Sequence, residues 1–202
     1  MTAPSPTHQI GEEDQLRAQM YDFLGLLLSR PPSLDVLQQT RGLSGDSSDL
    51  GEAINAMARV AKASKPAAVE SEFTALFIGL GRGELLPYTS FYLTGFLNEK
   101  PLALLRKDMA GLRITRADNV FEPEDNIASL LEMMAGMILG RFGDVVPLDK
   151  QAAFFNKHIG SWAPHFFDDL AAAKNSVFYA SVGAAGKAFI EIEREAFRMN
   201  VG

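Results

Sequence analysis

Apolar residues recur at helical spacing along almost the whole of this chain of 202 residues. In the most regular stretch, residues 123–142, apolar side chains lie three or four positions apart and so fall on one face of a helix. No stretch alternates apolar and polar residues as a half-buried strand does. The pattern therefore predicts an all-α protein with roughly eight to eleven helices, short ones included.

Proline and glycine mark where the expected helices begin and end. Pro31 and Pro32 should stop the first helix, and the glycines between Gly79 and Gly83 should interrupt the chain after the fourth. We expect helices from about Leu16 to the stop at Pro31, shortly after Ser33, and over residues 48–62, 66–80, 101–112, 123–142, 149–159 and 176–199. Another helix should follow Pro164 and carry Phe166, Phe167 and Leu170.

The length suits one domain with a single core. We expect residues 1–12 to form a flexible N-terminal tail and residues 13–202 to form one multi-helix bundle. Residues 1–7 have neither the basic start nor the apolar core of a secretory signal, and the aliphatic run from Leu24 to Leu28 is too short to cross a bilayer. We therefore expect no direct membrane insertion.

The composition excludes several classes of chemistry. The chain has no cysteine, which excludes disulfides, cysteine nucleophiles and thiolate metal sites and is compatible with a reducing cytoplasm. The net charge of −6 and the pI of about 5.1 disfavour a nucleic-acid partner, because binding to phosphates relies on clustered Lys and Arg. A basic peptide is a more natural partner.

Signs of catalysis or of a metal site are weak. The sequence has no Gly-x-Ser-x-Gly elbow. Pro164 separates His158 from His165, so hydrogen bonding at helix ends is the favoured role of these histidines. The glycines of residues 79–83 follow a helix and lack the Lys and the Ser or Thr that complete a phosphate-binding loop. We expect no metal and no cofactor.

Residues 84–95, Glu-Leu-Leu-Pro-Tyr-Thr-Ser-Phe-Tyr-Leu-Thr-Gly, concentrate groups that suit recognition. Pro87 breaks helical hydrogen bonding early in this segment. Tyr88 and Tyr92 offer both apolar area and phenol groups, which favour interfaces. The segment is therefore either a buried aromatic corner or a binding surface.

Acidic side chains crowd the start of the helix expected over residues 123–142. Glu122, Glu124 and Asp125 lie where carboxylates can meet free amide groups and the positive end of the helix dipole. Their spacing is unlike that of a calcium-binding EF-hand loop. The cluster therefore either caps the helix or attracts a cationic ligand.

These segments resemble the TorD/DmsD/NarJ family of redox enzyme maturation chaperones. The resemblance covers residues 16–28, the prolines at 31 and 32, residues 84–95, residues 122–126 and residues 155–167, a segment rich in aromatic side chains. It implies an all-helical, TorD-like chaperone bundle without enzymatic activity. It also implies binding in the cytoplasm to the twin-arginine signal peptide, or to the apo form, of a molybdenum-cofactor enzyme precursor. The chaperone would assist cofactor insertion and assembly of this precursor before export.

Several residues match the family motifs one by one. Tyr88, Ser90 and Tyr92 match the first motif, and Pro123 and Asp125 match the family's Pro-x-Asp-His pattern. The next position has asparagine in place of histidine, so a role that rests on a proton switch near neutral pH is not carried over. The predicted peptide-binding residues are Glu84, Tyr88, Ser90, Tyr92, Glu122, Pro123, Glu124, Asp125 and Asn126.

A twin-arginine peptide combines two guanidinium groups with an apolar stretch, so its receptor needs carboxylates beside a hydrophobic groove. We expect Glu122, Glu124 or Asp125 to attract the arginines, while Tyr88 and Tyr92 hold the apolar part.

Other interpretations stay open from the sequence. One is a chaperone of the same kind whose client enzyme is assembled and stays inside the cell. Another is a metal- or nucleotide-dependent helical enzyme that uses Glu84 or Asp125. The chain could act as a monomer or as a dimer that exchanges helices.

Overall fold

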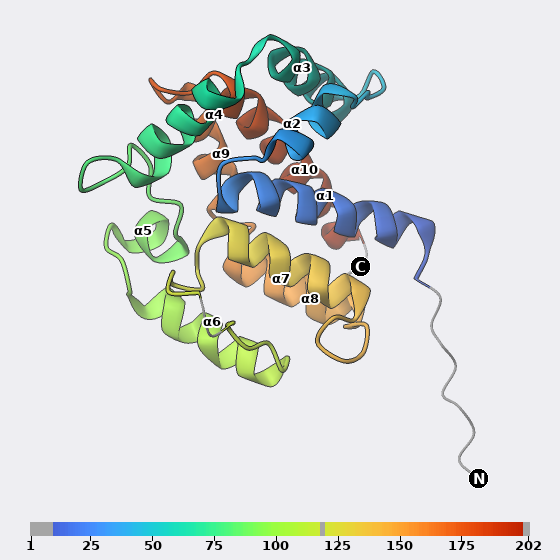
Figure 1. The fold of residues 1–202 in the computed structure, drawn as a ribbon. Coiled ribbons are helices and arrows are strands. Elements are labelled where there is room, and N and C mark those ends of the chain that lie inside the picture. The colour runs from blue at the N-terminus through green and yellow to red at the C-terminus, as the bar shows by residue number, and fades with distance from the viewer. Residues whose placement is uncertain (1–9, 118–119, 200–202) are drawn as a thin grey trace.

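A computed structural model describes residues 10–117 and 120–199. These residues form ten α-helices and one short π-helix, η1 (Figure 1). The elements are α1 (Glu12–Ser29), α2 (Leu34–Arg41), α3 (Asp49–Ala63), α4 (Pro66–Phe73), η1 (Thr74–Ile78), α5 (Thr89–Thr94), α6 (Lys100–Gly111), α7 (Ile127–Leu139), α8 (Leu148–His158), α9 (Ala163–Ala172) and α10 (Phe178–Met199). The predicted all-α fold class is confirmed.

Helix α1 begins at Glu12, the last residue of the predicted tail, and residues 1–9 of that tail lie outside the described residues. Among the helices of the described ranges, none combines the length and the apolar character that a membrane crossing requires.

Local sequence signals set several helix boundaries. Ser33 and Ser48 cap α2 and α3, because their hydroxyl oxygens accept hydrogen bonds from the backbone N–H groups of Val36, at 3.3 Å, and Gly51, at 3.1 Å. Proline occupies the first turn of α4, α6 and α9, where a helix needs no N–H donor. These signals explain why most of the expected helices start within a residue or two of their observed starts.

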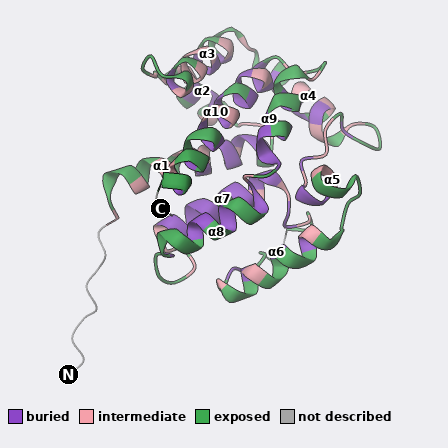
Figure 2. Cartoon of the chain, turned by 180° about the vertical axis from the view of Figure 1, so that it is seen from behind, coloured by how far each residue is buried: buried purple, intermediate pink, exposed green. Residues whose placement is uncertain are grey.

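Helix α7 lies at the centre of the bundle, with ten of its 13 residues buried (Figure 2). Helix α1 packs along it, and the two approach closely at Gly25, where an added Cβ would lie 3.3 Å from the carbonyl oxygen of Ala128. Helix α10 packs on α3 and α9. There an added Cβ at Gly183 would lie only 2.7 Å from the carbonyl oxygen of Phe167. Glycine is therefore required at the Gly183 crossing, whereas a Cβ at Gly25 would need a shift of only a few tenths of an ångström.

Three expectations about helices were wrong. The helix predicted over residues 123–142 is shorter, because Asn126 caps it at one end and Gly140, with a φ of 68°, ends it at the other. The helix predicted over residues 66–80 changes at Thr74 into the π-helix η1, and Gly79, with a φ of 61°, follows it. The periodic pattern does not predict α5, since six residues are too few to establish a period.

Candidate functional site

The two motifs singled out in the sequence lie side by side. The backbone N–H of Ile127 donates to the carbonyl oxygen of Pro87 at 2.8 Å, and that of Thr89 donates to the carbonyl oxygen of Asp125 at 2.9 Å. These two bonds form the antiparallel bridge between Tyr88 and Asn126. The start of α5 is therefore tied to the start of α7.

Asp125 is buried at this junction, with 1% of its surface exposed. Its Oδ2 accepts hydrogen bonds from the backbone N–H of Ser90 at 2.8 Å and from the hydroxyl of Ser90 at 2.6 Å. Ser90 lies in the first turn of α5, so Asp125 satisfies an amide that this helix leaves free. The predicted capping of α7 by the acidic cluster is wrong for Asp125, which instead serves α5.

Asn126 is the residue that caps α7. Its side-chain oxygen accepts a hydrogen bond from the backbone N–H of Ala128 at 2.9 Å. The half-buried Pro123 completes the turn, because its carbonyl oxygen accepts from the N–H of Asn126 at 3.2 Å. Both residues thus shape the turn that leads into α7.

Glu124 fixes α6 against this turn. It is 8% exposed, and its Oε2 accepts hydrogen bonds from Arg106 at 3.0 and 2.8 Å, while Arg116 lies 3.8 Å from Oε1. Burial acts to raise the pKa of the Glu124 carboxyl, but the hydrogen bonds and charges of the arginines outweigh it and bring the pKa below its ordinary value. The Glu124 carboxylate is therefore already paired with two arginines of its own chain.

Glu122 differs from its neighbours because it is exposed. The hydroxyl of Tyr88 donates a hydrogen bond to its Oε2. Partial burial, together with this carboxylate, raises the pKa of Tyr88, so the phenol stays protonated and remains a donor. No ion pair to Glu122 is found in the described part of the chain, so its charge is available to a ligand.

Tyr92 lies on another face of α5. Its hydroxyl donates to Asp169 Oδ2 at 2.8 Å, and its ring centroid lies 5.1 Å from that of Trp162. Burial and the hydrogen bond to Asp169 raise the pKa of Tyr92. The residue anchors α5 on α9.

Glu84 lies apart from the other predicted site residues. Its carboxylate accepts hydrogen bonds from the backbone N–H of Lys174 at 2.7 Å and from the side-chain amide of Asn175 at 2.8 Å. The bond from the Lys174 amide, with the bonds from Asn175, lowers the pKa of Glu84. Glu84 thus holds the turn between α9 and α10, and the structure does not bring it to Glu122.

Two adjoining pockets lie beside Glu122. The first, which we call the acidic pocket, has a volume of about 320 Å³ and lies between α1, α4, η1 and the start of α7. Its lining includes two carboxylates and no Lys, Arg or His. The lining residues are Leu28, Ser29, Phe73, Phe77, Ile78, Pro87, Tyr88, Val120, Glu122, Asn126, Ala128, Ser129 and Glu132.

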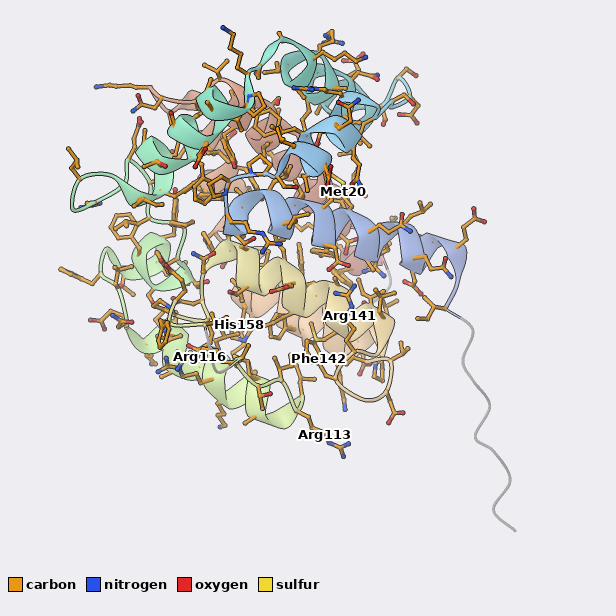
Figure 3. All side chains as sticks on the ribbon, in the orientation of Figure 1. Met20, Arg113, Arg116, Arg141, Phe142 and His158 are labelled. Carbon is orange, nitrogen blue, oxygen red and sulfur yellow. The ribbon has the colours of Figure 1, made fainter. Side chains whose placement is uncertain are left out.

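The second pocket, which we call the mixed pocket, has a volume of about 240 Å³ and shares Glu122 and Glu132 with the first. Apolar side chains such as Met133 and Phe142 line it together with Arg116 and Arg141. Figure 3 shows Arg141 and Phe142 together near the C-terminal end of α7. The two pockets adjoin each other, because Glu122 and Glu132 are among the residues that line both.

Sequence reasoning missed Glu132 as a site residue. It is exposed on α7, between buried neighbours, and the described residues make no hydrogen bond or ion pair to its side chain. The signal was present, because Glu132 is the last of four carboxylates in residues 121–132, a stretch with no Lys or Arg. Phe73 and Phe77, which come from α4 and η1, line the acidic pocket together with Glu132.

The described ranges contain no group of three or more His, Asp or Glu side chains arranged to hold a metal ion. His158 is buried, and its Nε2 lies 2.7 Å from Asp108 Oδ2. Burial lowers the pKa of His158 despite this carboxylate. The carboxylates of Glu84 and Asp125, the candidates for an enzymatic role, accept hydrogen bonds from backbone amides instead.

Comparisons of the sequence with known proteins agree with one another. The sequence model of the nitrate reductase delta subunit family matches residues 44–168. Chaperone protein TorD of Aliivibrio fischeri is 25% identical over 201 residues, which cover 89% of this chain and 94% of that protein. Chaperone protein TorD of Vibrio cholerae strain O395 is 26% identical over 168 residues, which cover 80% of this chain and 76% of that protein.

A comparison of the structures gives the same fold. A crystal structure described as that of a redox enzyme maturation protein from Archaeoglobus fulgidus aligns with a TM-score of 0.50 at 20% identity. The alignment covers 93% of this chain and 98% of that one. The helical bundle therefore extends over almost the whole of both chains.

Proposed function

Because the chain belongs to the nitrate reductase delta subunit family, we propose that it is a maturation chaperone that binds the twin-arginine signal peptide of a molybdenum-cofactor enzyme precursor. It acts in the cytoplasm before the precursor is exported. The relatives named above are chaperones, which supports a role without catalysis and confirms the resemblance to the TorD/DmsD/NarJ family.

The acidic pocket is the observation that carries this proposal. Glu122 and Glu132 supply two negative charges without a cation among the lining residues. Guanidinium groups pair with carboxylates through two parallel hydrogen bonds and stack on aromatic faces, which Phe73, Phe77 and Tyr88 supply. A volume of about 320 Å³ lies near the lower limit of ligand pockets and suits one or two side chains of a longer peptide.

The mixed pocket provides room for the apolar part of the same peptide. It continues from Glu122 and Glu132 toward Met109, Met133 and Phe142. Methionine side chains repack around different apolar partners, because they are flexible and polarisable. A peptide with two arginines in the acidic pocket would thus place the residues that follow them against an adaptable apolar wall.

Calorimetric titration with synthetic peptides tests the proposal. The first peptide has two adjacent arginines followed by an apolar, helix-forming stretch, and the second has lysines in place of the arginines. We expect the lysine peptide to bind about tenfold more weakly, because an ammonium group cannot form the two parallel bonds of a guanidinium. Equal affinity for the two peptides, or for a third with alanines at those positions, would contradict the proposal.

In a second possibility, which the resemblance to NarJ-type chaperones leaves open, the client enzyme is assembled and stays inside the cell. Affinity purification of this protein from anaerobically grown cells of the source organism distinguishes a client that is exported from one that stays inside. A co-purifying precursor with an intact twin-arginine signal supports the role before export. Recovery of only signal-less enzyme subunits supports assembly inside the cell.

A further inference from the structure

A second groove lies between α6 and α8, apart from the acidic and mixed pockets. It has a volume of about 400 Å³. Its walls carry three lysines and one aspartate, although the whole chain has a net charge of −6. The lining residues are Lys107, Asp108, Gly111, Leu112, Lys150, Ala153, Phe154 and Lys157. We call it the lysine groove.

Two of the three lysines have no hydrogen-bond or ion-pair partner in the described part of the chain. Lys157 Nζ lies 2.6 Å from Asp108 Oδ2, an atom that also contacts His158. Within the described residues, the exposed ammonium groups of Lys107 and Lys150 make no ion pair or hydrogen bond. The groove therefore has an excess of positive charge that its own carboxylate does not neutralise.

The spacing of the lysines suits a ligand with two negative charges along its length. Lys150 and Lys157 are seven residues apart on α8, so they lie on one face about 10 Å apart along its axis, with Phe154 between them. Two carboxylates three residues apart on a polyproline-like segment are separated by about 9 Å along that segment. This separation is close to the distance of about 10 Å between Lys150 and Lys157 along the axis of α8.

Apolar side chains line the groove between the lysines. They are Leu112, Ala153 and Phe154, and only 3% of Phe154 is exposed. The space beside Gly111 is open, because an added Cβ there would meet nothing within 4 Å. An apolar side chain between two acidic residues would fit against this lining.

We propose that the lysine groove binds an acidic segment of a partner protein, in which two carboxylates three residues apart flank an apolar side chain. The segment contacts Lys150 and Lys157 from one side and Lys107 from the other. The proposal does not depend on binding of a twin-arginine peptide, because the groove shares no lining residue with the acidic pocket.

Fluorescence anisotropy with a labelled peptide, Gly-Ser-Glu-Pro-Leu-Glu-Pro-Gly, tests this proposal. We expect it to bind, and the matching peptide with Gln in place of Glu to bind about tenfold more weakly. The affinity should fall as NaCl is raised from about 0.05 to 0.5 M, because exposed charges are screened. Absence of binding, equal binding of the Gln peptide, or complete displacement by about 10 mM inorganic phosphate would overturn the proposal.

Variants locate the binding site. Lys107→Glu combined with Lys150→Glu should weaken binding by about tenfold or more, whereas Lys62→Glu, at an exposed position on α3, should leave it unchanged. If the double reversal unfolds the protein, Lys107→Gln with Lys150→Gln gives the same test with a smaller change in charge. Asp108→Asn should tighten binding severalfold, because it removes the carboxylate that competes for Lys157. Unchanged affinity in both double variants would exclude this groove.

Discussion

Ser90 donates two hydrogen bonds to one oxygen of Asp125, from its backbone N–H at 2.8 Å and from its hydroxyl at 2.6 Å. The two residues are 35 positions apart in the chain, and both are buried. Because one lies at the start of α5 and the other precedes α7, this contact holds the acidic pocket in shape. Asp125 is therefore a structural residue of the junction between α5 and α7.

Asp125→Ala should lower the free energy of unfolding by about 2–4 kcal/mol, because it removes both charge-assisted hydrogen bonds and leaves the Ser90 donors buried without an acceptor. Urea unfolding at constant pH measures the loss. Asp144→Ala, at an exposed position between α7 and α8, is the matched control and should change stability little. If Asp125→Ala lowers the free energy of unfolding by less than about 0.5 kcal/mol, the contact between Asp125 and Ser90 does not stabilise the fold.

Glu132→Gln should weaken binding of the twin-arginine peptide by about tenfold while the melting temperature stays the same. Glu132 is exposed and makes no hydrogen bond or ion pair within the described residues, and Arg141, which its charge favours, keeps Asp22 as its partner, so the loss of this charge should cost the folded state little. Calorimetry and a melting curve on the same sample separate the two effects. Glu52→Gln, an exposed position on α3, should bind like the wild type. If both variants bind equally well, the arginines are not held in the acidic pocket.

Tyr92→Phe and Tyr92→Ala should differ widely in stability. The first loses only the partly exposed hydrogen bond to Asp169 and should cost about 0.5–1 kcal/mol. The second also removes the ring that packs on Trp162 and Phe166, and should cost about 2–3 kcal/mol. Chemical unfolding of both variants measures the difference. If Tyr92→Ala unfolds like the wild type but fails to bind the peptide, Tyr92 contacts the ligand and does not anchor α5.

The helices could be predicted from the sequence because each depends on signals within one short stretch. The prolines that start α4, α6 and α9 and the serines that cap α2 and α3 are all local. The family resemblance likewise picked out the two motifs that meet at the bridge between Tyr88 and Asn126.

The roles of single carboxylates could not be predicted in this way. Glu84 and Asp125 accept backbone hydrogen bonds from residues 90 and 35 positions away, and nothing in their own segments reveals these donors. Glu132 emerges as a pocket residue only because Phe73 and Phe77, from a different part of the chain, face the same hollow. Contacts between distant segments therefore decide which acidic residues are structural and which are available to a ligand.

The ion pair between Glu124 and Arg106 should make stability depend on pH. The pKa of Glu124 lies below its ordinary value of 4.5, so the pair's contribution is fully present above about pH 4.5 and is lost as the pH falls through the lowered value. Glu124→Gln should therefore reduce stability at pH 7 by roughly 1 kcal/mol, since Arg106 is half exposed, and by less at pH near 3. Urea midpoints across this range measure the difference, and Glu70→Gln, an exposed residue of α4, controls for loss of a carboxylate in general. A difference that stays constant with pH would mean that Glu124 stabilises the protein by packing alone.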